Sequence, residues 1–173
     1  DYDKLRSQLL LNKQVLTWSH TAPKSPLSTD AKTFSGIVLD DNQSNRNGFD
    51  SISQSNGPFL SSHYRHDSNA GKGLQNATFT FRIQKAGRYK LQLAWTSHAN
   101  RATNVPITLT TSAGKQNMLL NQQQKPEAAP FGTLGTFNLA PGIATVEIGN
   151  ANTDGYVILD GARMVQISKK PSN

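Results

Sequence analysis

From Phe34 onward, apolar residues recur at every second position in one short segment after another. In NATFTFRI (76–83), the residues Phe79, Phe81 and Ile83 share this spacing, and polar residues stand between them. Successive side chains of a β-strand point to opposite faces, so a period of two predicts strands that each bury one face.

The same pattern predicts strands along most of the remaining chain. Turn signals such as SNG, KAG, SAG, APG and NTDG separate them, and no second run of helical periodicity follows. About ten short antiparallel strands at this spacing are typical of an all-β sandwich, and we expect one of the jelly-roll kind. The other predicted strands are 35–40, 48–52, 62–66, 87–95, 105–110, 115–120, 132–139, 143–148, 156–160 and 162–167.

The first 33 residues differ from the rest. Apolar residues at helical spacing predict a short amphipathic helix over 2–11, VLTW at 15–18 predicts a short strand, and the Ser/Thr/Pro-rich stretch 19–32 predicts a linker. The helix packs either on this domain or at the junction with a preceding one. We therefore expect three parts: the N-terminal helix and linker 1–33, the sandwich 34–168 and a tail 169–173. Because the chain opens without a signal core, it is expected to be a mature form or a fragment.

Composition narrows the classes of partner. The chain has no cysteine, which excludes disulfides and thiolate metal sites. Its net charge of +7 is spread along the sequence, and no run is long enough to span a membrane. A diffuse positive field attracts anions, but no nucleic-acid motif is present. An anionic polysaccharide is therefore the expected partner, with no nucleic acid and no membrane, and the chain is expected to be a monomer.

The sequence holds no enzyme signature. It lacks a phosphate loop, a Gly-x-Ser-x-Gly elbow and a His-Glu-x-x-His helix. We therefore predict no catalytic residue. Asp40, Asp41 and Asp160 follow predicted strands, where carboxylates either bind a structural Ca²⁺ or bond their own backbone in a turn.

Polar side chains are concentrated in two successive connections between strands, 97–104 and 121–130. Amides, hydroxyls and arginine forks are the groups that read neutral sugars, and a lysine adds contact to a uronate or sulfate. Within the first connection, we expect His98 and Asn100 to contact ligand, and Arg101 and Asn104 to hold a corner of the fold first. The candidate ligand-binding residues are His98, Asn100, Arg101, Asn104, Gln122, Gln123, Tyr64, His66, Lys125 and Tyr156.

Two further expectations concern exposure. His98 and Gln122 to Gln124 are expected to be exposed, and Trp95 is expected in the core. The aromatic residues at strand ends or in turns, available for stacking on a sugar ring if exposed, are Phe59, Tyr64, Phe131 and Tyr156.

Several blocks together resemble the golvesin-like, or xanthan-lyase carbohydrate-binding-domain-like, module. These are HANRATNVPITL, NQQQ, LGTFNL and NTDGYVILDGARMV. The blocks DYDKLRSQLLLNKQVL, GIVLDDNQ, GPFLSSHYRHDSNAGKG and AGRYKLQLAWT resemble the C-terminal region of bacterial FAD-dependent oxidoreductases that are often labelled xanthan lyase. The resemblance covers about 34–167 and, more loosely, 1–18.

This resemblance implies a carbohydrate-binding β-sandwich placed after a catalytic domain, in a bacterial protein that is secreted, periplasmic or at the cell surface. We expect no cofactor, and FAD in particular is not expected because the dinucleotide-binding glycine motif is missing. The first hypothesis is a non-catalytic module that targets an attached enzyme to polysaccharide. The alternatives are a structural domain that packs on a parent FAD-dependent oxidoreductase, and a polysaccharide lyase or hydrolase.

Overall fold

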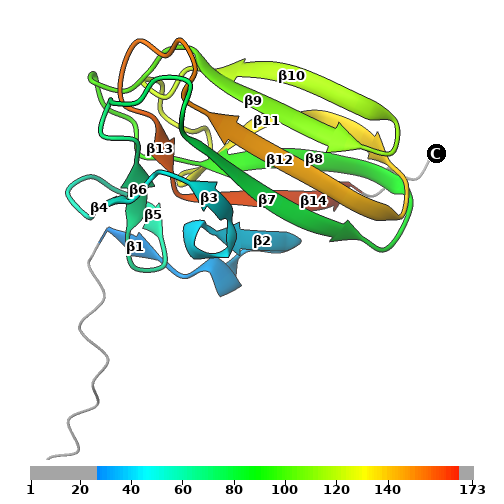
Figure 1. The fold of residues 1–173 in the computed structure, drawn as a ribbon. Coiled ribbons are helices and arrows are strands. Elements are labelled where there is room, and N and C mark those ends of the chain that lie inside the picture. The colour runs from blue at the N-terminus through cyan, green and yellow to red at the C-terminus, as the bar shows by residue number, and fades with distance from the viewer. Residues whose placement is uncertain (1–26, 168–173) are drawn as a thin grey trace, which may run out of the picture.

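The computed structural model describes residues 27–167, which form two antiparallel sheets packed face to face (Figure 1). The five-stranded sheet has the order β10 (Gly114–Leu120), β9 (Val105–Thr111), β12 (Gly142–Gly149), β7 (Asn76–Ile83) and β3 (Asn45–Asn47). The four-stranded sheet has the order β11 (Phe131–Leu139), β8 (Gly87–Ala94), β14 (Gly161–Ile167) and β2 (Ile37–Asp40). The predicted all-β sandwich is confirmed.

Two small sheets and two 3-10 turns complete the fold. β4 (Ser51–Ser53), β6 (Tyr64–His66) and β13 (Ile158–Leu159) pair antiparallel, whereas β1 (Ser28–Thr29) and β5 (Phe59–Leu60) pair parallel. The turns are η1 (Ala31–Thr33) and η2 (Asp41–Gln43).

Three of these strands were not predicted. β3 consists of Asn-Arg-Asn and has no apolar alternation, while β1 and β5 are two residues long. β1 and η1 also lie in the predicted linker, so the end of that segment is part of the folded domain. The predicted helix 2–11 and strand 15–18 lie outside the described residues.

The core lies between the two large sheets, and its residues are those of the period-two pattern. Phe79 and Phe81 point inward from β7 and meet Leu91 and Leu93 from β8, all of them buried. Trp95 continues this face just beyond β8 and is 5% exposed, which confirms its predicted place in the core. Its indole Nε1 donates to a backbone carbonyl, as a buried tryptophan requires.

The outward face of the four-stranded sheet carries a second, smaller apolar cluster. The guanidinium of Arg163 lies 5.4 Å from the ring centroid of Phe34 and 5.5 Å from that of Phe131, and the two rings pack edge to face. Arg163 also donates to the carbonyl and hydroxyl of Ser35. The segment before β2 is thereby fastened across the sheet.

The connections divide between two ends of the sandwich (Figure 1). The short hairpin turns 84–86, 112–113 and 140–141 lie at one end, which we call the hairpin end. The connections 67–75, 95–104, 121–130 and 150–157 lie at the other, which we call the loop end. β1 lies toward the loop end and the last described residue, Ile167, toward the hairpin end. Within the described part of the chain, no helix has the length and apolar character needed to cross a membrane.

Arg163→Lys is expected to destabilise the domain by about 1 kcal/mol, because an ammonium cannot stack as a plane between two rings while donating to Ser35. Urea denaturation measures the change. Arg88→Lys, an exposed arginine on the adjacent strand, is the matched control and should leave the midpoint unaltered. Equal midpoints for both variants would contradict the role given to Arg163.

Candidate functional site

The two polar connections singled out in the sequence meet at the loop end. The amide N–H of Gln122 donates to the carbonyl of Ala102 at 2.9 Å, and the Gln123 side chain donates to the carbonyl of Arg101 at 2.9 Å. On the other side, the N–H of Ala102 donates to the carbonyl of Tyr156. Backbone hydrogen bonds therefore join three separate connections into one surface.

Arg101 lies beneath this surface and holds it together. It is 5% exposed, and its guanidinium donates to the carbonyl and hydroxyl of Thr96, to the Asn100 amide oxygen and to the Tyr64 hydroxyl. Its Cζ also lies 5.7 Å from the centroid of the Tyr64 ring. A buried arginine needs such partners for all its donors, so Arg101 fixes the corner as expected.

Tyr64 and Gln122 are not available to a ligand. Tyr64 is 1% exposed, so its predicted availability for sugar stacking is wrong, and Phe59 and Phe131 are buried as well. Gln122, predicted to be exposed, is also 1% exposed. Its side-chain amide donates to the carbonyl of Ile158 and accepts from the N–H of the same residue, each at 2.8 Å. The amide replaces a strand partner for β13 and cannot turn outward.

Asn104 also has an architectural role. Its Nδ2 donates to the carbonyl of Asn152 at 2.8 Å, and its Oδ1 accepts from the N–H of Asp154 at 3.1 Å. Asp154 in turn accepts from the N–H of Thr103. These bonds clamp the NTDG turn onto the first polar connection.

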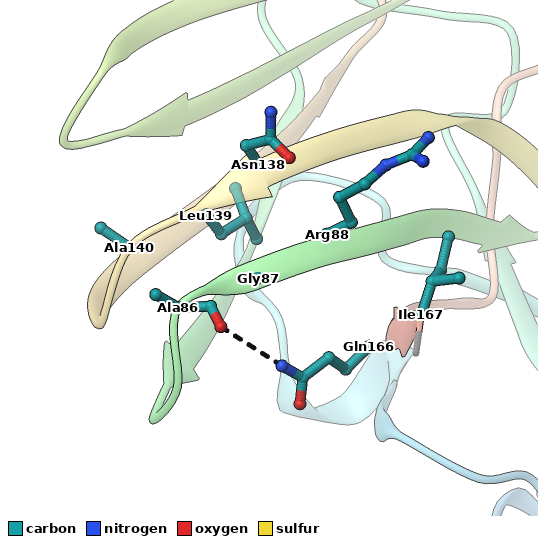
Figure 2. A pocket seen from close by; sticks show the side chains of 8 residues that line it. All are labelled: Ala86, Gly87, Arg88, Asn138, Leu139, Ala140, Gln166 and Ile167. Atoms are coloured by element: carbon teal, nitrogen blue, oxygen red, sulfur yellow. Dashed lines mark hydrogen bonds between the residues drawn. The ribbon is translucent and has the colours of Figure 1, made fainter. Parts of the chain in front are cut away.

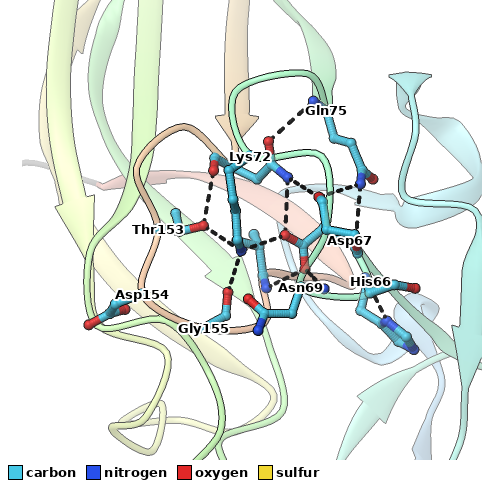
Figure 3. Close-up of polar contacts among 12 residues, drawn as sticks. His66, Asp67, Asn69, Lys72, Gln75, Thr153, Asp154 and Gly155 are labelled. Atoms are coloured by element: carbon cyan, nitrogen blue, oxygen red, sulfur yellow. Dashed lines mark hydrogen bonds and ion pairs between the residues drawn. The ribbon is translucent and has the colours of Figure 1, made fainter.

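A buried carboxylate that the sequence analysis missed organises the other half of the loop end (Figure 3). Asp67 is 1% exposed and accepts from the N–H groups of Asn69 and Val157, from the Asn150 amide and from the Lys72 ammonium, at 2.9 to 3.1 Å. Four donors from two connections satisfy one buried charge, which is what such burial demands.

Lys72 and Asn150 extend this network. The Lys72 ammonium also donates to the Thr153 hydroxyl and the Gly155 carbonyl, and Asn150 accepts from the N–H of Gly73 (Figure 3). The signal in the sequence was weak, because Asp67 and Asn150 stand 83 positions apart and each looks like an ordinary turn residue. The NTDG turn and the 67–75 connection are thus one cross-linked unit.

Five predicted residues remain accessible above this framework. His98, Asn100, Gln123 and Lys125 are exposed, and the His98 ring nitrogen Nδ1 lies 2.9 Å from the Asn100 amide oxygen. Tyr156 is half-buried. Amide, imidazole and phenol groups next to one another can both hydrogen-bond and stack on a sugar ring.

His66 packs against this group. Its ring meets that of Tyr156 edge to face, with centroids 5.6 Å apart. Burial, and secondarily the charge of Arg101, lowers the pKa of His66, while Asp67 opposes this effect. The imidazole is therefore neutral at pH 7, and because its Nδ1 accepts from the N–H of Ser68, its Nε2–H is left to donate.

Lys125 lies to the side of this cluster. It lines a hollow of about 410 Å³ between the edge strands β10 and β11, together with Trp95, Asn121 and Glu127. Glu127 accepts from the N–H of Thr133, which fixes one wall of the hollow. The ammonium of Lys125 thus belongs to a neighbouring surface that a longer ligand could reach.

Asp40, Asp41 and Asp160, which follow predicted strands, lie in a separate cluster at the end of β2. Both carboxylate oxygens of Asp160 accept from the N–H of Leu60, at 3.1 and 3.2 Å. Asp41 is fully buried, and its Oδ2 lies 3.5 Å from both His63 Nε2 and Arg65 Nε. Asp40 starts the turn η2, where its N–H donates to Gln43.

The surroundings of these aspartates bear on the predicted structural calcium. Over residues 27–167, no three His, Asp or Glu side chains come together in a way that could hold a metal ion. Basic groups face Asp41 instead, and Asp160 is occupied by backbone. The guanidinium of Arg65 lies 3.5 Å from Asp41, but neither carboxylate oxygen of Asp41 accepts a hydrogen bond from a protein group. The alternative of structural calcium stays a prediction that chelation can test.

Burial, followed by the charge of Asp40, raises the pKa of Asp41 to about 7, against the opposing charges of Arg65 and Arg46. The folded state therefore holds a proton that the unfolded chain releases near pH 4. The stability that this proton confers is present below about pH 4 and is lost as the pH rises to about 7.

Asp41→Asn is therefore expected to flatten the fall in unfolding free energy between pH 4 and pH 7, as measured by urea denaturation. The pKa values of Asp40 and Asp160 are also raised, so these residues likewise lower the unfolding free energy as the pH rises, in both proteins. The pKa values of His63 and His66 are lowered, so these residues have the opposite effect. Asp41→Asn also removes the Asp41 charge that helps to raise the pKa of Asp160, so the flattening includes a smaller contribution from Asp160. Parallel pH profiles would contradict the assignment to Asp41.

Removal of divalent cations is expected to leave the melting temperature unchanged, because His63 and Arg65 lie at 3.5 Å from the buried Asp41 and no group of three possible metal ligands occurs in residues 27–167. Differential scanning calorimetry in EDTA and in excess Ca²⁺ measures this. A melting temperature that rises with Ca²⁺, and does so in the parent but not in Asp41→Asn, would instead establish the calcium site.

Comparison with known proteins agrees with this architecture. The chain is 32% identical over 108 residues to xanthan lyase of Bacillus sp. (strain GL1), a match that covers 60% of this chain and 11% of the relative. Among solved structures, Paenibacillus xanthan lyase superposes with a TM-score of 0.70 at 30% identity, covering 76% of this chain and 13% of that one. The chain thus spans only about a tenth of the length of these relatives.

A likeness in fold extends further. A CBM35 from Cellvibrio japonicus Abf62 superposes with a TM-score of 0.54 at 15% identity, over 78% of this chain and 95% of that one. The model of the Golvesin C-terminal domain family matches residues 38–166, which include both large sheets and all four loop-end connections. The chain therefore belongs to the Golvesin C-terminal domain family.

Proposed function

We propose that this domain is a non-catalytic carbohydrate-binding module that holds an attached catalytic domain on a polysaccharide. The loop end provides the main support for this proposal. One accessible surface lies there over a rigid framework, and it is formed by His98, Asn100, Gln123, His66 and Tyr156. A preformed surface loses little conformational entropy on binding, which favours recognition of a flexible polymer.

The fold and family support this function. The structures that share the fold include carbohydrate-binding modules, and the relatives with higher identity are xanthan lyases that are much longer than this chain. We propose by extension that the domain is part of an exported bacterial enzyme acting on polysaccharide. The net charge of +7 favours an anionic polymer.

The buried carboxylates argue for binding rather than hydrolysis. A glycosidase places two carboxyl groups across a cleft. Asp67 and Asp160 are instead buried, and both accept backbone N–H groups. Their bonds are structural, so neither is free to transfer a proton to a substrate.

A second candidate is an interaction domain that packs on its parent enzyme without binding sugar. The burial of Phe59, Tyr64 and Phe131 favours it, because only Tyr156 among the four candidate stacking residues is not buried. Measured affinity for a purified parent domain, with no retardation in any polysaccharide gel, would support this candidate over the first.

Affinity electrophoresis of the 173-residue chain tests the proposal, with gels containing alginate, pectin, xanthan or a neutral β-glucan. We expect retardation in at least one gel. Asn100→Ala and Tyr156→Ala should each weaken binding by about tenfold, or about 1.4 kcal/mol, since each removes a contact from the accessible surface.

Gln84→Ala is the control, because Gln84 is exposed in a turn at the opposite, hairpin end. It should leave the retardation unchanged. Unaltered mobility of the parent chain in every gel would count against sugar binding altogether. Equal loss in Gln84→Ala and Asn100→Ala would place the site away from the loop end.

A further inference from the structure

A row of polar side chains runs along the outward face of the four-stranded sheet, away from the loop end. Arg88 and Lys90 stand two residues apart on β8, so both side chains project from one face, about 6.6 Å apart along the strand. The strand register places Asn138 opposite Arg88 and Thr136 opposite Lys90 on β11. We call these four residues the outer track.

The other neighbour of β8 gives the outer track an apolar margin. On β14, Val165 lies opposite Lys90 and Ile167 lies opposite Arg88, and both are half-buried. A chain lying along β8 would therefore meet cations and hydrogen-bonding groups on one side and apolar surface on the other. Sugar chains present the same combination, with polar edges and apolar ring faces.

The track runs into a hollow at the hairpin end. The hollow has a volume of about 890 Å³ and is lined by Arg88, Asn138, Leu139 and Ile167, among others. Figure 2 shows the Arg88 and Asn138 side chains rising from the same side of two adjacent strands. Cavities of about 300–1,000 Å³ accommodate small ligands, so the hollow has room for a sugar unit.

The charge of the outer track is not neutralised by its surroundings. Within residues 27–167, Arg88 forms no ion pair and its guanidinium donates no hydrogen bond. Glu127 lies near enough to Lys90 for the ammonium to help lower the pKa of that carboxyl, but Glu127 is itself bound to the N–H of Thr133. Arg163 adds a third cation farther along the face.

The outward face of the five-stranded sheet differs. Its cations Arg82 and Lys115 are far apart, on β7 and β10, and Glu147 on β12 lies between those strands. Arg82 faces the exposed Ile143 across the sheet. On the four-stranded face, by contrast, the cations Arg88 and Lys90 each lie opposite a hydrogen-bonding residue. Variants of the five-stranded face are therefore suitable controls for variants of the four-stranded face.

We propose that the outer track binds carboxylate groups of an anionic polysaccharide that lies along β8. Arg88 forms a bidentate contact with a carboxylate, Asn138 and Thr136 bond the adjoining hydroxyls, and Lys90 interacts with a second charged unit. The proposal rests on the proposed function, because it assumes that the domain binds polysaccharide. It adds a second surface, which selects for negative charge, while the loop end contacts sugar of either kind.

The test compares alginate, as the anionic probe, with a neutral β-glucan, in affinity electrophoresis and calorimetry at low and high salt. The double variant Arg88→Gln/Lys90→Gln is expected to bind alginate about tenfold more weakly at low salt and to lose most of its salt dependence. Its binding to the β-glucan should be unchanged. Arg82→Gln/Lys115→Gln removes the same charge from the other face and should leave alginate binding within about twofold of the parent.

The outcomes separate this inference from the proposed function. Unchanged alginate binding in Arg88→Gln/Lys90→Gln overturns the outer track, and a changed sedimentation coefficient in that variant would assign the face to a protein partner instead. Equal losses in the two double variants also overturn it, since they indicate a general effect of net charge. If alginate binding is weakened in Arg88→Gln/Lys90→Gln but not in Asn100→Ala or Tyr156→Ala, the outer track is supported and the loop-end site is contradicted. A parent chain that binds neither polymer overturns both.

Discussion

The loop end depends on one buried charge. Asp67 has almost no contact with water, and its four donors come from two connections: the Asn69 N–H and the Lys72 ammonium from 67–75, and the Asn150 amide and the Val157 N–H from 150–157. Removing the Lys72 ammonium leaves a buried carboxylate without an opposite charge, which is costly. Backbone hydrogen bonds from Ala102 to Tyr156 and from Gln122 to Ala102 then attach the other two connections to this unit.

The polar side chains of these connections differ in whether they are buried. Side chains that point toward the sheets replace missing backbone partners, as Gln122 does for Ile158 and Arg101 does for Thr96. The side chain of Asn100 also accepts from the Arg101 guanidinium, and the His98 ring accepts from the Asn100 N–H, yet both residues stay exposed. The type of a residue is thus no guide to its role, since NQQQ contains both the buried Gln122 and the exposed Gln123.

The positions of the long strands could be predicted from the sequence more accurately than the burial of side chains in the loops. The alternation in β7, β8, β9 and β12 reports directly on a buried face, and those strands lie where the pattern predicts them. β3, with the sequence NRN, pairs only because β7 offers it an open edge, which no local signal reveals. Likewise, Gln122 and Tyr64 are buried by segments that come much later or earlier in the chain. Whether these two side chains are buried depends on tertiary contacts rather than on residue type.

The fastening of the N-terminal segment has a mechanical consequence. The described chain enters near the loop end at β1 and finishes at Ile167 near the hairpin end (Figure 1). Tension between those two points would act along the strands rather than across them. β1 is held by only two paired residues, whereas β14 pairs with both β8 and β2. The two-residue β1 contact would yield before β14, and Arg163 would still hold Phe34 and Ser35, which follow β1, against the four-stranded sheet.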